Sequence, residues 1–116
     1  MTTLDQAQVE FRDSPCLLTA LTYANVAQEY FLDGMIGWET ADAAYVETTP
    51  IIVGSRMWFD YPHAFVTLPD YTAHRDQLVT VTARDYDCDE ENAPMFKVTA
   101  DDGWTGTAWL EELVLD

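Results

Sequence analysis

The chain has 116 residues, of which 48% are apolar, so it can build the core of one folded domain and is too apolar for a disordered chain. It carries 21 acidic residues against five basic ones, which gives a formal net charge of −16. This charge argues against direct binding to nucleic acid or to an anionic membrane surface, because both depend on Lys and Arg side chains.

The first third of the chain predicts helices. Ser14 followed by Pro15 is typical of a helix start, with a side-chain cap and then proline at the first helical position. Apolar residues then recur three and four positions apart and fall on one helix face: Leu17, Leu21, Ala24, Ala27 and Phe31. Gly34 predicts the end of this helix. A shorter helical turn is predicted over residues 4–11, and residues 39–46 fit either a strand or a helix.

Beyond Gly34 the sequence favours short strands. They are predicted at residues 56–59, 78–84, 95–100 and 104–109. Within the second strand Val79, Val81 and Ala83 alternate with polar residues and are expected on its buried side. The turn signal Asp101-Asp102-Gly103 predicts a hairpin, and residues 110–113 predict a short helical turn.

Several motifs after residue 50 point to a known kind of barrel. They are Val53-Gly54-Ser55-Arg56, Tyr61-Pro62-His63, Leu68-Pro69 with Tyr71, Ala93-Pro94-Met95-Phe96-Lys97-Val98, and Ala108-Trp109-Leu110-Glu111-Glu112-Leu113. Residues 51–114 thereby resemble a small SH3-like β-barrel, in particular the C-terminal barrel of nitrile hydratase β subunits. The expected fold is α+β, a single domain over residues 1–116. It would have a helical segment at 1–34 followed by a small antiparallel SH3-like β-barrel at 51–114.

The sequence departs from that family in two places. The family's metal is held by a cysteine cluster of the partner α subunit, and no such cluster occurs here. Arg75-Asp76-Gln77 also lies where these barrels usually carry a glycine. The resemblance therefore implies an SH3-like accessory subunit that docks on an enzyme partner, and it does not imply nitrile hydration. Docking would use Trp58, Tyr61, Phe65 and Trp104, while the helix face around Leu17 and Phe31 could instead form a homodimer.

No cofactor, metal or catalytic site is predicted. Asp85, Asp87 and Asp89 alternate as in a calcium loop, but its sixth position is Glu90 rather than glycine and its twelfth is Phe96 rather than glutamate. No short ligand spacing joins the cysteines and histidines, which are Cys16, Cys88, His63 and His74. No nucleophile elbow or phosphate-binding loop occurs, so the chain is not expected to be an enzyme.

The leading functional hypothesis is a nucleic-acid mimic. Spaced carboxylates on a folded surface can imitate a phosphate backbone and occupy the basic groove of a nucleic-acid-binding protein or complex. The candidate partner-binding residues are Asp85, Asp87, Asp89, Glu90, Glu91, Asp101, Asp102, Glu111 and Glu112. In size and charge the chain is similar to the acidic phage proteins that block CRISPR or restriction systems. The similarity is limited to size and charge, and no sequence motif is shared.

Two other interpretations stay open. An acid excess with a single lysine, Lys97, is also typical of salt-adapted organisms, and the charge would then indicate habitat. The four tryptophans, Trp38, Trp58, Trp104 and Trp109, could form a peptide-binding face, although about two are expected in the core. Residues 1–8 lack the pattern of a signal peptide, and no membrane span is predicted, which favours a cytoplasmic location, or the host cytoplasm if a phage encodes the chain.

Overall fold

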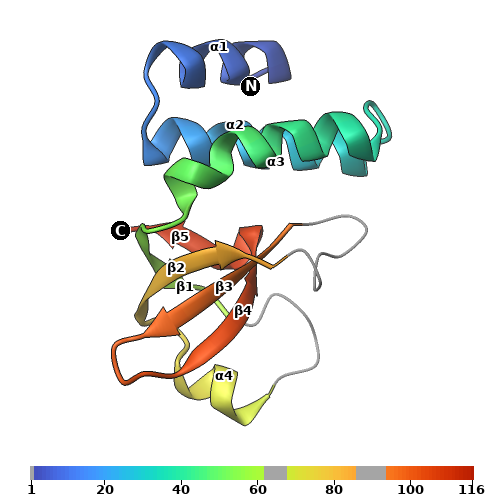
Figure 1. The fold of residues 1–116 in the computed structure, drawn as a ribbon. Helices are drawn as coiled ribbons and strands as arrows, with labels where there is room; N and C mark the ends of the chain where they lie inside the picture. The colour runs from blue at the N-terminus through green and yellow to red at the C-terminus, as the bar shows by residue number, and fades with distance from the viewer. Residues whose placement is uncertain (1, 62–67, 86–93) are drawn as a thin grey trace. The chain divides into compact units, whose positions relative to one another are not determined.

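The computed structural model describes residues 2–61, 68–85 and 94–116 (Figure 1). They divide into two compact units, a helical unit that ends at Ile52 and a sheet unit that begins at Val53. Helices and an antiparallel sheet both occur, so the α+β class is confirmed. None of the described helices is long and apolar enough to cross a membrane.

Within the described residues the helical unit contains three helices, α1 (Leu4–Asp13), α2 (Leu17–Leu32) and α3 (Trp38–Ile52). The middle helix, α2, contacts both of the others. Its buried face and that of α3 are rich in alanine: Ala20, Ala24, Ala27, Ala41 and Ala44. Small side chains at a contact let two helix axes approach closely. The larger side chains of Phe11 and Tyr45, both at most 5% exposed, complete this core.

The helix boundaries differ from the prediction at one point. Ser14 does not start α2; it ends α1, where its N–H donates to the Glu10 carbonyl at 3.0 Å. The N-cap of α2 is Cys16, and the Thr19 hydroxyl accepts from the Cys16 N–H at 3.1 Å. Thr19, at the third position of the helix, thus satisfies the N–H of the cap residue, whereas the expected serine cap would have accepted from an N–H of the first turn. The predicted end of the helix is confirmed, since Gly34 has φ +75°.

In the described part of the sheet unit, five antiparallel strands pair in the order β4-β3-β2-β1-β5. They are β1 (Arg56–Phe59), β2 (Leu78–Arg84), β3 (Met95–Ala100), β4 (Thr105–Trp109) and β5 (Leu113–Leu115). A short helix, α4 (Pro69–Ala73), precedes β2, and a 3-10 turn, η1 (Leu110–Glu112), precedes β5. β4 and β5 end the strand order, and no pairing of the described residues closes the sheet between them.

One face of the sheet forms the core of this unit. Its large fully buried side chains on β1, β2 and β3 are Met57, Phe59, Val79, Val81, Phe96 and Val98, and Ala108 on β4 and Leu110 on η1 are fully buried as well. The alternation predicted for β2 fails at its end, because the register shifts between Val81 and Ala83. The irregularity leaves Ala83 half-buried and buries Arg84 instead.

Candidate functional site

The structure separates the acidic residues that the sequence analysis grouped. Asp87, Asp89, Glu90 and Glu91 lie outside the described residues. Of the other five, Asp101 and Asp102 are exposed and Glu111 is half-buried. Asp85 and Glu112 are only 8% and 5% exposed. Two of the nine candidates therefore present a largely open carboxylate in the part of the chain that is described.

Glu112 has a structural task at the edge of the sheet. Its Oε1 accepts a hydrogen bond from the Trp109 N–H at 2.9 Å, and the Tyr71 hydroxyl accepts from the Thr107 N–H at 3.0 Å. Both N–H groups belong to β4, which is an edge strand. Unpaired N–H groups on an edge invite pairing with other chains, so side chains that occupy them protect the edge. The hydrogen bond to the edge strand explains the inward position of Glu112, and no contact with another protein is needed to account for it.

The hairpin between β3 and β4 holds its two aspartates in defined orientations. Asp101 forms two hydrogen bonds with the Arg56 guanidinium, at 2.9 Å and 3.1 Å. This pairing lowers the pKa of Asp101. Asp102 accepts from the Trp104 N–H at 2.9 Å, which is the main cause that lowers the pKa of Asp102, with a further contribution from His74. Both carboxylates are ionised and fixed in direction.

His74 connects this hairpin to α4. Its Nε2 lies 2.8 Å from Asp102 Oδ2, and its Nδ1 lies 2.7 Å from the Asp70 carbonyl oxygen. Both partners are acceptors, so the ring satisfies both only when each nitrogen carries a proton. The Asp70 carbonyl first, and then Asp102, raise the pKa of His74. The His74 ring stacks on Trp104 with ring centroids 4.3 Å apart and planes within 9°.

Sequence reasoning missed this network. The sequence presents His74 only as a possible metal ligand, and its carboxylate partner, Asp102, lies 28 positions later in the chain. No local spacing could reveal the pair, which forms because the β3–β4 hairpin returns to α4. Among the described residues no group of three or more His, Cys, Asp and Glu side chains could hold a metal ion.

A depression of about 570 Å³ lies beside this network. Its lining includes one aromatic ring and four charged side chains: Trp58, Arg56, Asp76, Asp101 and Asp102. Trp58 on β1 is 40% exposed, so part of its indole ring is open to solvent. The expectation that about two tryptophans lie in the core is wrong, because each of the other three is half-buried.

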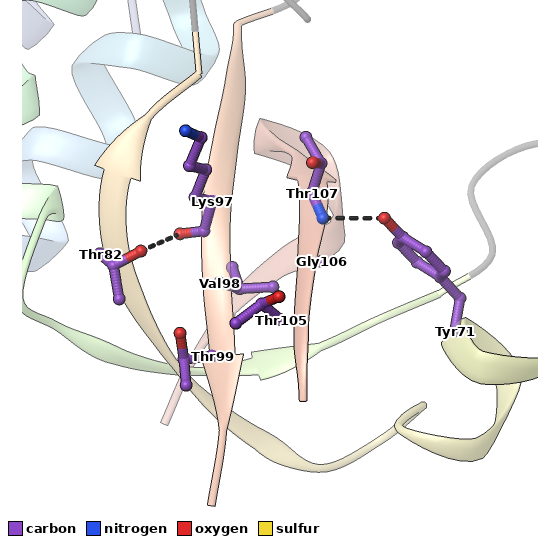
Figure 2. Close-up of a pocket in the computed structure, with 8 residues that line it drawn as sticks. All are labelled: Tyr71, Thr82, Lys97, Val98, Thr99, Thr105, Gly106 and Thr107. Carbon is purple, nitrogen blue, oxygen red and sulfur yellow. Dashed lines mark hydrogen bonds between the residues drawn. The ribbon is translucent and has the colours of Figure 1, made fainter. Parts of the chain in front are cut away.

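A second depression of about 430 Å³ lies over β2, β3 and β4 (Figure 2). Hydroxyl groups and one ammonium group surround it: Tyr71, Thr82, Lys97, Thr99, Thr105 and Thr107. Figure 2 shows the Tyr71 hydroxyl bonded to the Thr107 N–H and the Thr82 hydroxyl bonded to the Lys97 carbonyl. Among the described residues, its lining contains threonine and tyrosine hydroxyls and the Lys97 ammonium, and no carboxylate or imidazole.

Comparison with known proteins adds no further constraint. The chain matches no protein-family model, no curated protein and no solved structure.

Proposed function

We propose that this chain is a non-enzymatic, acidic protein-binding domain. It acts as a nucleic-acid mimic that occupies the basic groove of a nucleic-acid-binding protein, such as a CRISPR or restriction complex. The observation that carries the proposal is the balance of exposed charge. Twelve acidic side chains are exposed in the described part of the chain, against four basic ones. Such a surface attracts a cationic partner and speeds the encounter with it.

The exposed basic residues reduce this excess very little, because most already face a carboxylate. Arg12 pairs with Glu47 at 2.8 Å and Arg56 with Asp101 at 2.9 Å. Arg75 lies 3.6 Å from Asp76. Lys97 is exposed and forms no ion pair with the described residues. An approaching basic groove therefore meets few cations that are free to repel it.

The helical unit supplies half of the exposed carboxylates. They are Asp5, Glu10, Asp13, Glu29, Asp33 and Glu39. The one basic residue of this unit, Arg12, is held by Glu47. Glu10 and Asp13 lie three positions apart on α1, so their side chains are neighbours on its surface. The helical unit therefore carries an exposed acidic excess of its own, and Asp101 and Asp102 add exposed charge to the sheet unit.

The proposal is tested by capture and competition. The immobilised chain would be incubated with lysate at about 0.15 M salt and again at about 1 M, where the Debye length falls from roughly 8 Å to 3 Å. We expect to capture a protein that binds nucleic acid, to lose it at high salt and to displace it with added DNA or RNA. The purified partner should then lose its nucleic-acid binding when it is titrated with the chain.

A matched variant separates charge from fold. The triple substitution E10Q, D13N and E39Q removes three exposed charges from the helical unit and keeps similar side-chain shapes. We expect it to capture the same partner more weakly at 0.15 M salt. A partner that survives 1 M salt, or one that binds the chain and nucleic acid at the same time, would overturn the mimic proposal.

A second candidate function is an SH3-like accessory subunit that docks on an enzyme. One observation favours it. Trp58 lies in register between Leu78 and Val114, and its exposed ring is accompanied by an exposed valine.

Of the four docking residues named from the sequence, Tyr61 is buried, Trp104 is half-buried and Phe65 lies outside the described residues. The accessory function therefore rests on Trp58. It predicts capture that is insensitive to salt and is weakened by W58A.

A further inference from the structure

The depression around Trp58 combines a partly exposed aromatic ring with carboxylates. Its volume of about 570 Å³ lies within the range of ligand-binding pockets and is ample for one long side chain. Exposed aromatic rings in concave surfaces are typical anchors of protein interfaces. The strand register explains why the ring is held in place, because Trp58 lies between Leu78 on β2 and Val114 on β5.

The charges around this ring are unequal. Three carboxylates and one guanidinium line the depression. The Arg56 guanidinium forms a two-bond pair with Asp101, and Asp102 is shared between His74 and the Trp104 N–H. Asp76 has the loosest partner of the three, since its nearest cation is Arg75 at 3.6 Å. Its side chain is 74% exposed, so its charge is open to an incoming cation.

Asp76 also occupies a backbone conformation that would suit glycine better. Its φ is +60°, and among the described residues it is the one non-glycine residue with positive φ. Its N–H donates to the Phe59 carbonyl at 2.8 Å, which fixes this turn against the end of β1. Aspartate and asparagine adopt this conformation more readily than other non-glycine residues, so the turn holds in a fixed position an exposed carboxylate that lines the depression.

We propose that this depression binds an arginine or lysine side chain from a basic segment of the partner protein, with the cation on the Trp58 ring and the Asp76 carboxylate as its counter-charge. A cation over a tryptophan face is attracted by the ring, and the nearby carboxylate adds a charge-assisted hydrogen bond. This inference rests on the proposed function, because it assumes that the partner is basic. It adds a defined site to what is otherwise a diffuse anionic surface.

The test uses a fluorescein-labelled hexa-arginine peptide and the full chain at low salt. Anisotropy gives the dissociation constant, and the NMR signal of the Trp58 indole N–H, assigned with W58L, reports whether the peptide reaches this ring. We expect the Trp58 signal to shift on titration. W58L and D76N should each weaken binding about two- to fivefold, as single exposed cation–π and ion-pair contacts do. Asparagine also tolerates positive φ, so D76N preserves the turn.

Two controls keep the outcomes distinct. D60N removes one exposed charge from the same unit, outside this depression, and should change the dissociation constant by much less than D76N. D76G should weaken peptide binding as much as D76N does. Because glycine adopts positive φ without strain, the unfolding midpoint of D76G should not fall.

Equal effects of D60N and D76N, with a silent Trp58 signal, would overturn the site and leave the mimic proposal standing. A wild-type chain that fails to bind the peptide at all would count against both proposals.

Discussion

At the residue scale, His74 makes the stability of the sheet unit depend on pH. Its pKa in the folded chain is raised above the ordinary histidine value of 6.5. The imidazolium contacts with Asp70 and Asp102 therefore contribute fully below pH 6.5, and their contribution is lost as the pH rises through the folded pKa. We expect the urea midpoint to fall over that interval and H74Q to remove the fall.

The measurement needs a background free of other groups that titrate nearby. C16S, C88S and H63Q remove both thiols and the second imidazole. In that background a single histidine titrates by NMR, and its midpoint should lie above 6.5. A midpoint at or below this value would mean that His74 is neutral, so that one of its two hydrogen bonds is lost in solution.

Glu112 allows a second prediction at this scale. The substitution E112A leaves the Trp109 N–H of the edge strand without its acceptor, so we expect the free energy of unfolding to fall by about 1–3 kcal/mol. E112Q keeps an oxygen acceptor and should cost less. Urea denaturation measures both. If E112A unfolds like wild type and instead loses the captured partner, Glu112 is a contact residue and the edge explanation is wrong.

At the element scale, β4 is built around the contact between Gly106 and Trp104. A Cβ on Gly106 would overlap the six-membered part of the Trp104 indole, which is held from other sides by Tyr71, Phe59 and His74. The ring must therefore move in G106A. We expect a loss of about 1–3 kcal/mol in the free energy of unfolding, as overpacking usually causes. The ring-current shift of the His74 protons should disappear.

G103A is the matched control for this prediction. Gly103 has φ +92°, and a Cβ added to it would have no neighbour within 4 Å, so its substitution strains the backbone without a clash. A cost of about 1–2 kcal/mol is expected from the left-handed conformation alone. The His74 shift should stay in place, because the stack on Trp104 is untouched. Retention of that shift in G106A would contradict the packing described for β4.

The elements that could be predicted are those with strong local signals. The bounds of β1, β2 and β3 follow from alternation and turn residues, and the Asp101–Gly103 turn from its composition. Helix α3 was ambiguous because threonine and valine favour strands and Pro50 lies in its last turn. β5 has three residues, too few for a period, and exists because β1 pairs with it. Pairing between strands so far apart in the chain produces no local pattern in the sequence.

The candidate site was less predictable than the fold for the same reason. The sequence shows how many carboxylates exist, but not that Glu112 turns inward to an edge strand or that Asp102 turns toward His74. The positive φ of Asp76 and its place beside the Trp58 ring arise only in the folded backbone, and composition alone does not reveal them.

At the scale of the whole molecule, the net charge of −16 predicts how the chain responds to salt. Self-repulsion destabilises a compact state, and screening weakens the repulsion. The exposed ion pairs oppose this trend only slightly, because each contributes little to stability. We therefore expect the melting temperature to rise between about 0.02 M and 0.5 M NaCl. The triple variant E10Q, D13N and E39Q should melt higher at low salt and rise less.

The same measurement decides how the charge should be interpreted. A chain that is folded at about 0.15 M salt and only gains stability above it can use its carboxylates to bind a basic partner under conditions where such binding is strong. A chain that unfolds below about 1 M salt would carry its charge as an adaptation to habitat, and a salt-sensitive partner could not bind it in the folded state. Circular dichroism melts across this salt range, run beside the capture experiment, distinguish a binding role for the charge from an adaptation to habitat. Only a binding role is consistent with a chain that is folded at about 0.15 M salt and captures a partner that high salt releases.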